Sequence, residues 1–423
     1  MIKLPAVVGD DDETFGGSIF TNPGGPGGSG VEQVLGGGEW FQKLTALEGK
    51  RNYEIVSFDP RGVGLTQPTS DCFHTDRVGR DAFVFEARGV GRLDGGGHAV
   101  PYRLAMVDGF GNRCLEAEEA YGDGMAFVNT PSVARDMVAM IDKIDELRKG
   151  SRADRDDDRL ELRKRSISSE NNESRDLPRL QYMGFSYGTV LGNYFATLFP
   201  GRVGRLLLDG VDNADDYAQG PGWLTNLEDT DEIFDTFFEG CFKAGPSVCP
   251  LLREEDMSAE DTKTRVWSWI NHLGESPQSA LDASGLPLVI SAIDVLSMVG
   301  ESLYNPTPSF RQMARIINDS MRGNYTELIS QLKNSGLPAI EDACALRPGN
   351  SIGRPEAQSA ILCGDGDDIS DKDVPWWEDY ITQQANASQP KLVFQGSLLN
   401  SKTGDNSKAA TKSAGSSYTV LHQ

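Results

Sequence analysis

Several features that would place this chain in a common class of protein are missing from its sequence. No run of 18 or more apolar residues occurs, so the sequence predicts no membrane-spanning helix. None of the six cysteines forms a C-x-x-C pair. The four histidines lack the spacing of metal ligands: His74, His98, His272 and His422. The sequence therefore predicts neither a metal nor another cofactor.

Basic residues are also scarce relative to acidic ones. The chain has 40 Lys and Arg against 63 Asp and Glu, which gives a net charge of -23. Such a charge repels nucleic acids and anionic membrane surfaces, and neither is expected as a partner. The 423 residues exceed one ordinary core. This length favours either one large α/β domain with an insertion or two domains.

The N-terminal segment "MIKLPAVVGDDDE" has no basic region followed by an apolar one, so it does not resemble a signal peptide. Either the chain is intracellular or its natural N-terminus is missing. Cys241 and Cys249 flank seven residues and could close a small disulfide loop, while the other four cysteines could form two further bridges. Buried free thiols are the alternative. Four N-x-S/T sequons favour secretion: Asn172, Asn318, Asn324 and Asn386.

The segment "LQYMGFSYGTVLGNYFATLFP" places one serine between two glycines. Gly184 to Gly188 match G-x-S-x-G, the pattern of a sharp strand-to-helix turn that exposes a serine hydroxyl. An apolar run begins at Leu180, and apolar residues recur at helical spacing from Val190 onward. This context predicts that Ser186 is a nucleophile. The alternative is a serine in an ordinary strand-to-helix turn.

A glycine-rich stretch near the N-terminus, "TNPGGPGGSG", follows a short apolar strand at 18–21. Its five glycines between Gly24 and Gly30 let backbone N–H groups approach a phosphate or the oxyanion of an acyl-transfer intermediate. The stretch lacks the Lys-Ser/Thr ending of a phosphate-binding loop. An oxyanion-binding turn is therefore predicted, with a flexible loop as the alternative.

The order of the other elements predicts the fold class. An apolar strand is expected at 55–58, with Asp59 and Arg61 fixing the loop after it. A helix is expected to begin with Thr130 as N-cap, and a further strand follows the elbow at 205–211. Alternating elements of this kind predict a mostly parallel sheet with helices on both faces.

Two segments are expected to lie outside this sheet. The charged run at 148–176 has almost no apolar period and is expected to form a solvated surface insertion. From 216 to 389 the apolar period is helical, which predicts a helical lid inserted above the elbow. The expected domains are thus 1–215 as the core, 216–389 as the lid and 390–423 as the C-terminal part of the core.

Five segments together resemble the tripeptidyl aminopeptidase branch of the α/β-hydrolase fold, relatives of proline iminopeptidase: "TNPGGPGGSG", "VSFDPRGVGLTQPTSDC", "TPSVARDM", "MGFSYGTVLGNYFATLFPGRVGRLLLDGVDN" and "ILCGDG". The resemblance implies that Ser186 is the nucleophile. It implies that the oxyanion is held by the N–H of Tyr187 and an N–H in the Gly24-Gly25 turn. It also implies secretion, disulfides, and release of short peptides or single residues from a free N-terminus.

The C-terminal segment departs from this family. Members share an apolar strand ending in Asp-Pro-Val-Thr-Pro and a later Gly-His, which supply the acid and the base of the triad. Neither motif occurs here, and Asp405 and His422 are the remaining candidates for acid and base. Impaired activity is therefore expected. A serine exopeptidase acting through an acyl-enzyme on peptide substrates is the main hypothesis. A carboxylesterase for small acyl esters and a non-catalytic binding protein are the alternatives.

Overall fold

The structure of the protein is a computed structural model that describes residues 1–47, 49–64, 66–74, 76–122, 124–160, 177–220, 222–335, 337 and 354–388. The predicted acid Asp405, the predicted base His422, Cys344 and the sequon at Asn172 lie outside the described residues. The predicted C-terminal part of the core, 390–423, lies outside them as well.

The central element is a five-stranded sheet in the order β1-β3-β2-β4-β5. Strands β2, β3, β4 and β5 pair in parallel, and the short β1 pairs antiparallel with β3. The strand bounds are β1 Ile2–Leu4, β2 Phe15–Asn22, β3 Asn52–Ser57, β4 Leu180–Phe185 and β5 Val203–Asp209. The predicted mostly parallel sheet is confirmed.

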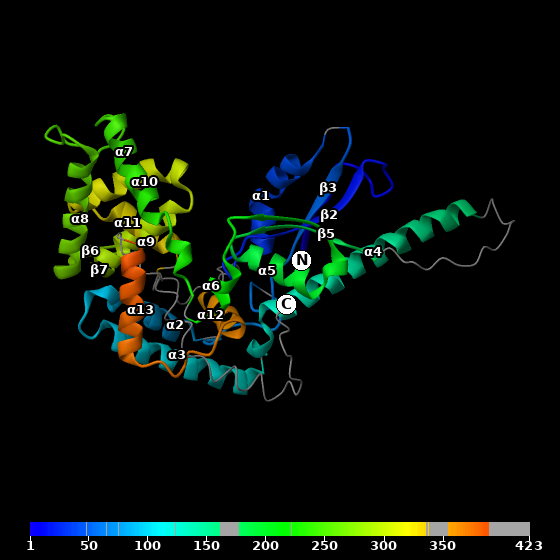
Figure 1. Ribbon diagram of the computed structural model, residues 1–423, viewed down its shortest axis with the longest axis horizontal. Helices are drawn as coiled ribbons and strands as arrows, with labels where there is room; N and C mark the ends of the chain where they lie inside the picture. The colour runs from blue at the N-terminus through cyan, green and yellow to red at the C-terminus, as the bar shows by residue number, and fades with distance from the viewer. Residues whose placement is uncertain are drawn as a thin grey trace.

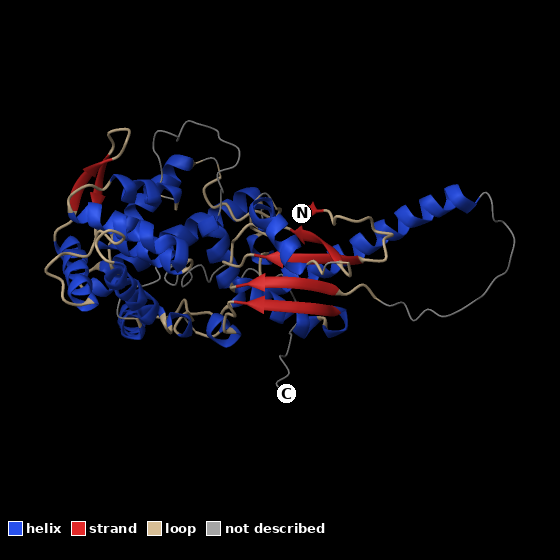
Figure 2. Ribbon diagram, turned by 90° about the horizontal axis from the view of Figure 1, so that it is seen from above, coloured by secondary structure: helices blue, strands red, loops and turns tan. Residues whose placement is uncertain are grey.

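Helices cover both faces of this sheet (Figure 2). On one face Ile19, Ile55 and Met183 pack with α1 (Gly30–Thr45) through Val34 and Phe41. On the other face, the apolar side chains of α4 (Thr130–Leu160) and α5 (Tyr187–Leu198) form one buried cluster with β2, β3 and β4. This two-sided burial explains why the neighbouring residues Ile55 and Val56 are both apolar and buried, although they face opposite sides of the sheet.

Helix α4 corrects part of the sequence analysis. Its first half buries Val133, Met137 and Ile141 as predicted, but the helix continues to Leu160, well into the run expected to be a solvated insertion. Arg148, the first residue of that run, forms an ion pair with Glu54, whose side chain is 2% exposed. A buried carboxylate requires such a partner, so this end of the charged run belongs to the core packing. Beyond it α4 projects away from the sheet (Figure 1).

Most of the remaining helices form the other part of the molecule, while α6 and α12 lie near the sheet and pack in the same buried cluster as α4 and α5 (Figure 1). Their bounds are α2 Arg77–Gly89, α3 Ala99–Tyr121, α6 Ala214–Ala218, α7 Thr230–Ala244, α8 Ala259–Glu275, α9 Ala292–Leu303, α10 Pro306–Met321, α11 Thr326–Asn334, α12 Arg354–Asp365 and α13 Val374–Ala387. Single-turn 3₁₀ helices lie at Leu93–Gly95, Met125–Phe127, Pro200–Arg202 and Thr225–Leu227. The parallel strands point toward this helical part (Figure 2).

The segment expected to be entirely helical also contains a hairpin. Strands β6 (Gln278–Leu281) and β7 (Pro287–Ile290) pair antiparallel. The turn between them is held by Asp282, whose side chain accepts hydrogen bonds from the amides of Ser284 and Leu286. The helical period found over 216–389 thus missed this hairpin, because the turn stabilises two strands of only four residues each.

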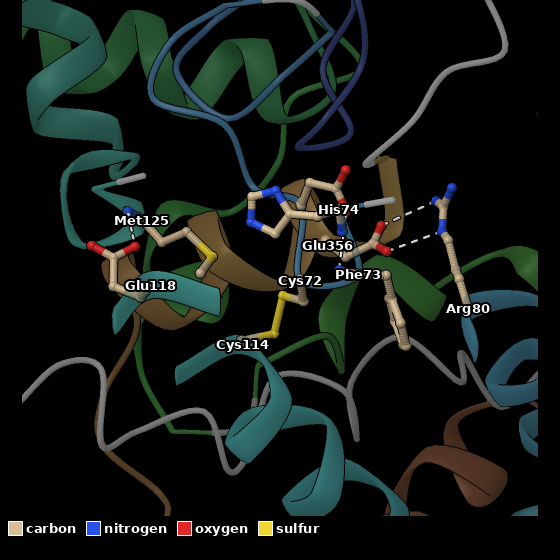
Figure 3. Close-up of a disulfide and its surroundings, with 9 residues drawn as sticks. Cys72, Phe73, His74, Arg80, Cys114, Glu118, Met125 and Glu356 are labelled. Carbon is tan, nitrogen blue, oxygen red and sulfur yellow. Dashed lines mark hydrogen bonds and ion pairs between the residues drawn. A yellow bond between two sulfur atoms is a disulfide. The ribbon is translucent and has the colours of Figure 1, made fainter. Parts of the chain in front are cut away.

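Among the described residues, two disulfides cross-link the helical part. The predicted bridge between Cys241 and Cys249 is confirmed, with a Cα–Cα distance of 5.2 Å. A second bridge joins Cys72, in the loop after β3, to Cys114 on α3 (Figure 3). No helix in the described part of the chain has both the length and the apolar character to cross a membrane.

Candidate functional site

The strand-to-helix turn predicted from the sequence is present at Ser186. This residue lies between β4 and α5 with φ 52° and ψ -128°, a region that non-glycine residues rarely occupy. Its side chain is exposed, while Tyr187 and Gly188 directly after it are buried. The turn thus places the serine at the surface of an otherwise packed segment, where strain is maintained by the surrounding structure.

The glycines on either side of Ser186 are required by close packing. A Cβ atom on Gly184 would lie 2.3 Å from the carbonyl oxygen of Gly188, and one on Gly188 would lie 2.8 Å from the carbonyl oxygen of Asn22. Both separations are shorter than real Cβ contacts. The G-x-S-x-G spacing therefore reflects the close approach of β4, α5 and the end of β2.

The glycine-rich turn after β2 lies directly against this elbow. A Cβ on Gly24 would lie 2.3 Å from the carbonyl oxygen of Phe185 and 2.9 Å from both the Ser186 Cβ and the Tyr187 amide nitrogen. Gly24 has φ 89° and Gly25 has φ 120°, values that favour glycine. The two segments singled out in the sequence are thus brought together, although 160 residues separate them.

Two backbone amides at this contact were predicted to bind an oxyanion. The Tyr187 amide is in the first turn of α5, where an N–H has no carbonyl acceptor within its own helix. The Gly24 amide already donates to Asn22 Oδ1 at 2.9 Å. For the Gly25 amide, no acceptor is recorded among the described residues. Of the two glycines predicted to supply the donor, Gly25 is thus the one without such an acceptor among the described residues, and its oxyanion role stays a prediction.

Hydrogen bonds from the next strand hold the elbow in place. The Ser186 amide donates to the carbonyl of Asp209, the last residue of β5, at 3.2 Å. The Thr189 hydroxyl donates to the Ser186 carbonyl at 2.7 Å and accepts from the Asp212 amide at 3.0 Å. Asp212 is therefore two hydrogen bonds away from the serine. Burial first, and then the nearby Asp216 carboxylate, raises the pKa of Asp212.

A network around Asp365, which the sequence analysis did not identify, joins the helical part to the elbow. Asp365 ends α12 and accepts from the amide of Thr130 at 2.7 Å, the hydroxyl of Thr130 at 2.5 Å and the hydroxyl of Tyr217 at 2.8 Å. The Thr130 hydroxyl also contacts the hydroxyl of Tyr187. Through these contacts the carboxyl group is linked to the residue next to Ser186. The only feature of the sequence that pointed to Asp365 was the segment "ILCGDG", which contains it and ends one residue later.

This network also corrects the predicted start of α4. Thr130 was expected to be the N-cap, but the Ser132 amide donates to Asn129 Oδ1 at 3.0 Å, so Asn129 supplies the cap. The Thr130 side chain is fully buried and is bonded to Asp365. A threonine before a helix has the same local sequence pattern whether its side chain caps the helix or is buried. Only the contact between Thr130 and Asp365 distinguishes the two cases.

The loop residues Asp59 and Arg61 have structural partners. Asp59 accepts from the Ser29 hydroxyl at 2.6 Å and the Val31 amide at 3.2 Å, at the start of α1. Arg61 forms a two-point ion pair with Asp136 on α4, at 2.7 Å and 2.9 Å. Both residues thus hold the segments that carry the glycine-rich turn and α4, as expected.

Among the histidines of the described residues, the structure identifies no base for Ser186. His272, the one histidine after Ser186 among the described residues, is exposed near the end of α8. Within the described residues, no group of histidine, cysteine or acidic side chains is arranged to hold a metal ion. Asp405 and His422 remain predictions.

Comparisons with known proteins agree with the sequence resemblance. Serine protease Hip1 of Mycobacterium tuberculosis is 28% identical over 380 residues, which cover 88% of this chain and 60% of that protein. Tripeptidyl aminopeptidase of Streptomyces coelicolor is 29% identical over 201 residues, 47% of this chain and 28% of that protein. Carboxylesterase B of Mycobacterium tuberculosis is 32% identical over 143 residues, 32% of this chain and 23% of that protein.

These matches confirm the resemblance to the tripeptidyl aminopeptidase-like branch of the α/β hydrolases. The relatives are named as a protease, a peptidase and an esterase, which are all hydrolases. The chain spans about 60% of the length of the mycobacterial protease. No protein-family model matches it.

The carboxyl group of Asp365 makes the stability of the folded chain depend on pH, which can be tested. Burial raises its pKa to about 6, against the hydrogen bonds from Thr130 and Tyr217, which favour the charged form. The folded chain binds this proton more tightly than the unfolded chain, so protonation of Asp365 stabilises the folded state. This contribution to the free energy of unfolding is complete below about pH 4. It is lost as the pH rises through about 6, and the loss amounts to up to about 3 kcal/mol.

We expect Asp365→Asn to remove this loss, because an amide does not ionise. Between about pH 4 and pH 7, the free energy of unfolding of the variant relative to the wild type should shift in favour of the variant by up to about 3 kcal/mol. Urea unfolding across this range measures the shift. Asp367→Asn, at an exposed carboxylate two residues away, is the control. If the free energies of unfolding of Asp365→Asn and the wild type differ by the same amount at every pH, the raised pKa of Asp365 is contradicted.

Proposed function

We propose that this chain is a serine hydrolase in which Ser186 is the nucleophile. The observation that carries the proposal is the strained, exposed Ser186 in contact with the glycine-rich turn. In the proposed reaction the Ser186 hydroxyl attacks a substrate carbonyl and passes its proton to a base. The base then gives the proton to the leaving group, an acyl-enzyme remains, and water releases the acid. His422 as the base and Asp405 as the acid are retained from the sequence.

The oxyanion of the tetrahedral intermediate is proposed to lie between the Tyr187 and Gly25 amides. Two preorganised N–H donors stabilise charge that develops in the transition state, and removing one such donor from an enzyme typically lowers kcat by about 100-fold to 1000-fold. Support comes from the 2.9 Å approach of a Gly24 Cβ to the Tyr187 nitrogen, because it shows that the glycine-rich turn reaches the start of α5.

An exopeptidase acting on free N-termini is the substrate class that we infer. Asp212 lies in the loop just after β5, and the neighbouring Asp216 carboxylate raises its pKa beyond the effect of burial. A substrate ammonium group placed there would relieve this repulsion and form a charge-assisted hydrogen bond. The helical segment 216–389 is proposed to act as the lid that limits access. The name of one relative, tripeptidyl aminopeptidase, agrees with this class, and the name of another, serine protease, agrees with peptide cleavage in general.

A carboxylesterase is the second candidate. One observation favours it: the match to carboxylesterase B has the higher identity, 32%, although it covers only 143 residues. The same elbow serves ester and peptide cleavage, so the elbow alone does not separate the two. Secretion is also proposed, because two disulfides persist in oxidising compartments.

Labelling with a fluorophosphonate probe tests the nucleophile. We expect one covalent label per chain on Ser186, because among the described residues only this serine combines an exposed elbow with two nearby amide donors. Ser186→Ala should abolish labelling without changing the thermal unfolding midpoint. Ser132→Ala, on the neighbouring helix α4, should label like the wild type. A label that survives Ser186→Ala would refute the assignment.

Paired reporter substrates test the substrate class. A tripeptide reporter with a free N-terminus should be cleaved with a higher kcat/KM than its N-acetylated form. Asp212→Asn should reduce this preference by about tenfold, the size of one lost charge-assisted hydrogen bond. Asp215→Asn, at an exposed carboxylate on α6, is the control and should keep the preference. Equal cleavage of both reporters by the wild type would exclude the exopeptidase, and rapid cleavage of a small acyl ester alone would favour the esterase.

A further inference from the structure

A cavity of about 430 Å³ lies between α2 and α3 on one side and α9, α11 and α12 on the other. Ser186 and the glycine-rich turn are not among the residues that line it. Its volume is within the range of about 300 to 1,000 Å³ that small-molecule sites occupy. The cavity is therefore a candidate site separate from the elbow.

Aromatic rings form one wall of this cavity. Phe73, Phe83 and Phe110 line it and contact one another, with ring centroids 5.2 to 6.1 Å apart. The Cys72–Cys114 disulfide fixes this wall, because it joins the residue before Phe73 to the helix that carries Phe110 (Figure 3). Such a wall is suited to an apolar or aromatic group of a ligand.

Three arginines of the described residues line the cavity, and two of them are neutralised by partners. Arg80 forms a two-point contact with Glu356 of α12, at 3.0 Å and 3.1 Å, and Figure 3 shows the pair beside Phe73. Arg88 pairs with the buried Asp294 of α9 at 2.6 Å. These pairs hold α2 against the helices on the opposite side of the cavity.

The third arginine, Arg103 of α3, has no such partner. Its side chain is 2% exposed, and its Nη2 donates to the carbonyl of Ala87 at 2.9 Å. Its Nε is buried without a hydrogen-bond acceptor, and no acidic group of the described residues forms an ion pair with it. Burial lowers its pKa to about 10, so the guanidinium is still charged at neutral pH.

A buried cation without a counter-ion is costly, because the charge loses its hydration without a compensating interaction. The planar guanidinium matches the two oxygens of a carboxylate. A dianionic phosphate is less suited, because Asp294, Glu301 and Glu356 also line the cavity. One unpaired positive charge is best compensated by one negative charge.

We propose that this cavity binds a small carboxylate whose apolar or aromatic group packs against Phe73, Phe83 and Phe110 while its carboxylate accepts hydrogen bonds from Arg103. The proposal does not depend on the role of Ser186. It assigns to α3 a binding function that is independent of the hydrolase reaction.

Isothermal titration with 3-phenylpropanoate and with the matching neutral amide, 3-phenylpropanamide, tests the site. The wild-type chain should bind the acid at least about tenfold more tightly than the amide, the difference expected for a charge-assisted hydrogen bond. Phenyl phosphate, which carries the same ring, should bind more weakly than the acid. Equal affinity for acid and amide would overturn the proposal, and tighter binding of phenyl phosphate would overturn the assignment of a carboxylate.

Variants of Arg103 locate the binding. Arg103→Met should remove the preference for the acid while leaving the thermal unfolding midpoint unchanged or raised, because a buried charge is replaced by an apolar side chain of similar length. Arg103→Lys keeps the charge without the planar fork and should bind the acid about tenfold more weakly. Arg135→Met, at an exposed arginine of α4, is the control. Acid binding unchanged in a folded Arg103→Met or Arg103→Lys chain would contradict the proposal.

Discussion

The close approach of the glycine-rich turn to the nucleophile elbow is the constraint on which the rest of this site depends. A side chain on Gly24 would collide with the backbone of Phe185 and with Ser186. The absence of that side chain lets the ends of β2 and β4 meet, and their parallel pairing places both at the same edge of the sheet. The positive φ of Ser186 is held by this packing together with its hydrogen bond to Asp209.

Helix α12 connects this elbow with the helical part of the molecule. Near its start Glu356 pairs with Arg80 of α2, and at its end Asp365 bonds to Thr130 at the start of α4. Thr130 in turn contacts the hydroxyl of Tyr187, the residue after the proposed nucleophile. One short helix therefore fixes the wall of the cavity around Arg103 at one end and the base of the elbow at the other.

The sequence was sufficient for features that depend on local geometry. The turn at Ser186 and the disulfide between Cys241 and Cys249 require particular residues at fixed spacing, so their patterns were visible. The proximity of Gly24 to the elbow was implied by the family resemblance, and the parallel pairing of β2 with β4 explains it. Features set by distant contacts were not predictable. The partner of Thr130 is 235 residues away, and the isolated charge of Arg103 is defined by helices far apart in the chain.

The most direct test of the central claim is the rate of fluorophosphonate labelling in Gly24→Ala compared with Gly36→Ala. Gly36 lies in α1 with no atom near its missing Cβ, so that substitution should leave the rate unchanged. Alanine at Gly24 would push the turn away from Tyr187 and misplace the Gly25 amide, and the rate should fall by about 100-fold or more, as for loss of an oxyanion donor. A folded Gly24→Ala chain that labels at the wild-type rate would show that this contact does not build the reactive site.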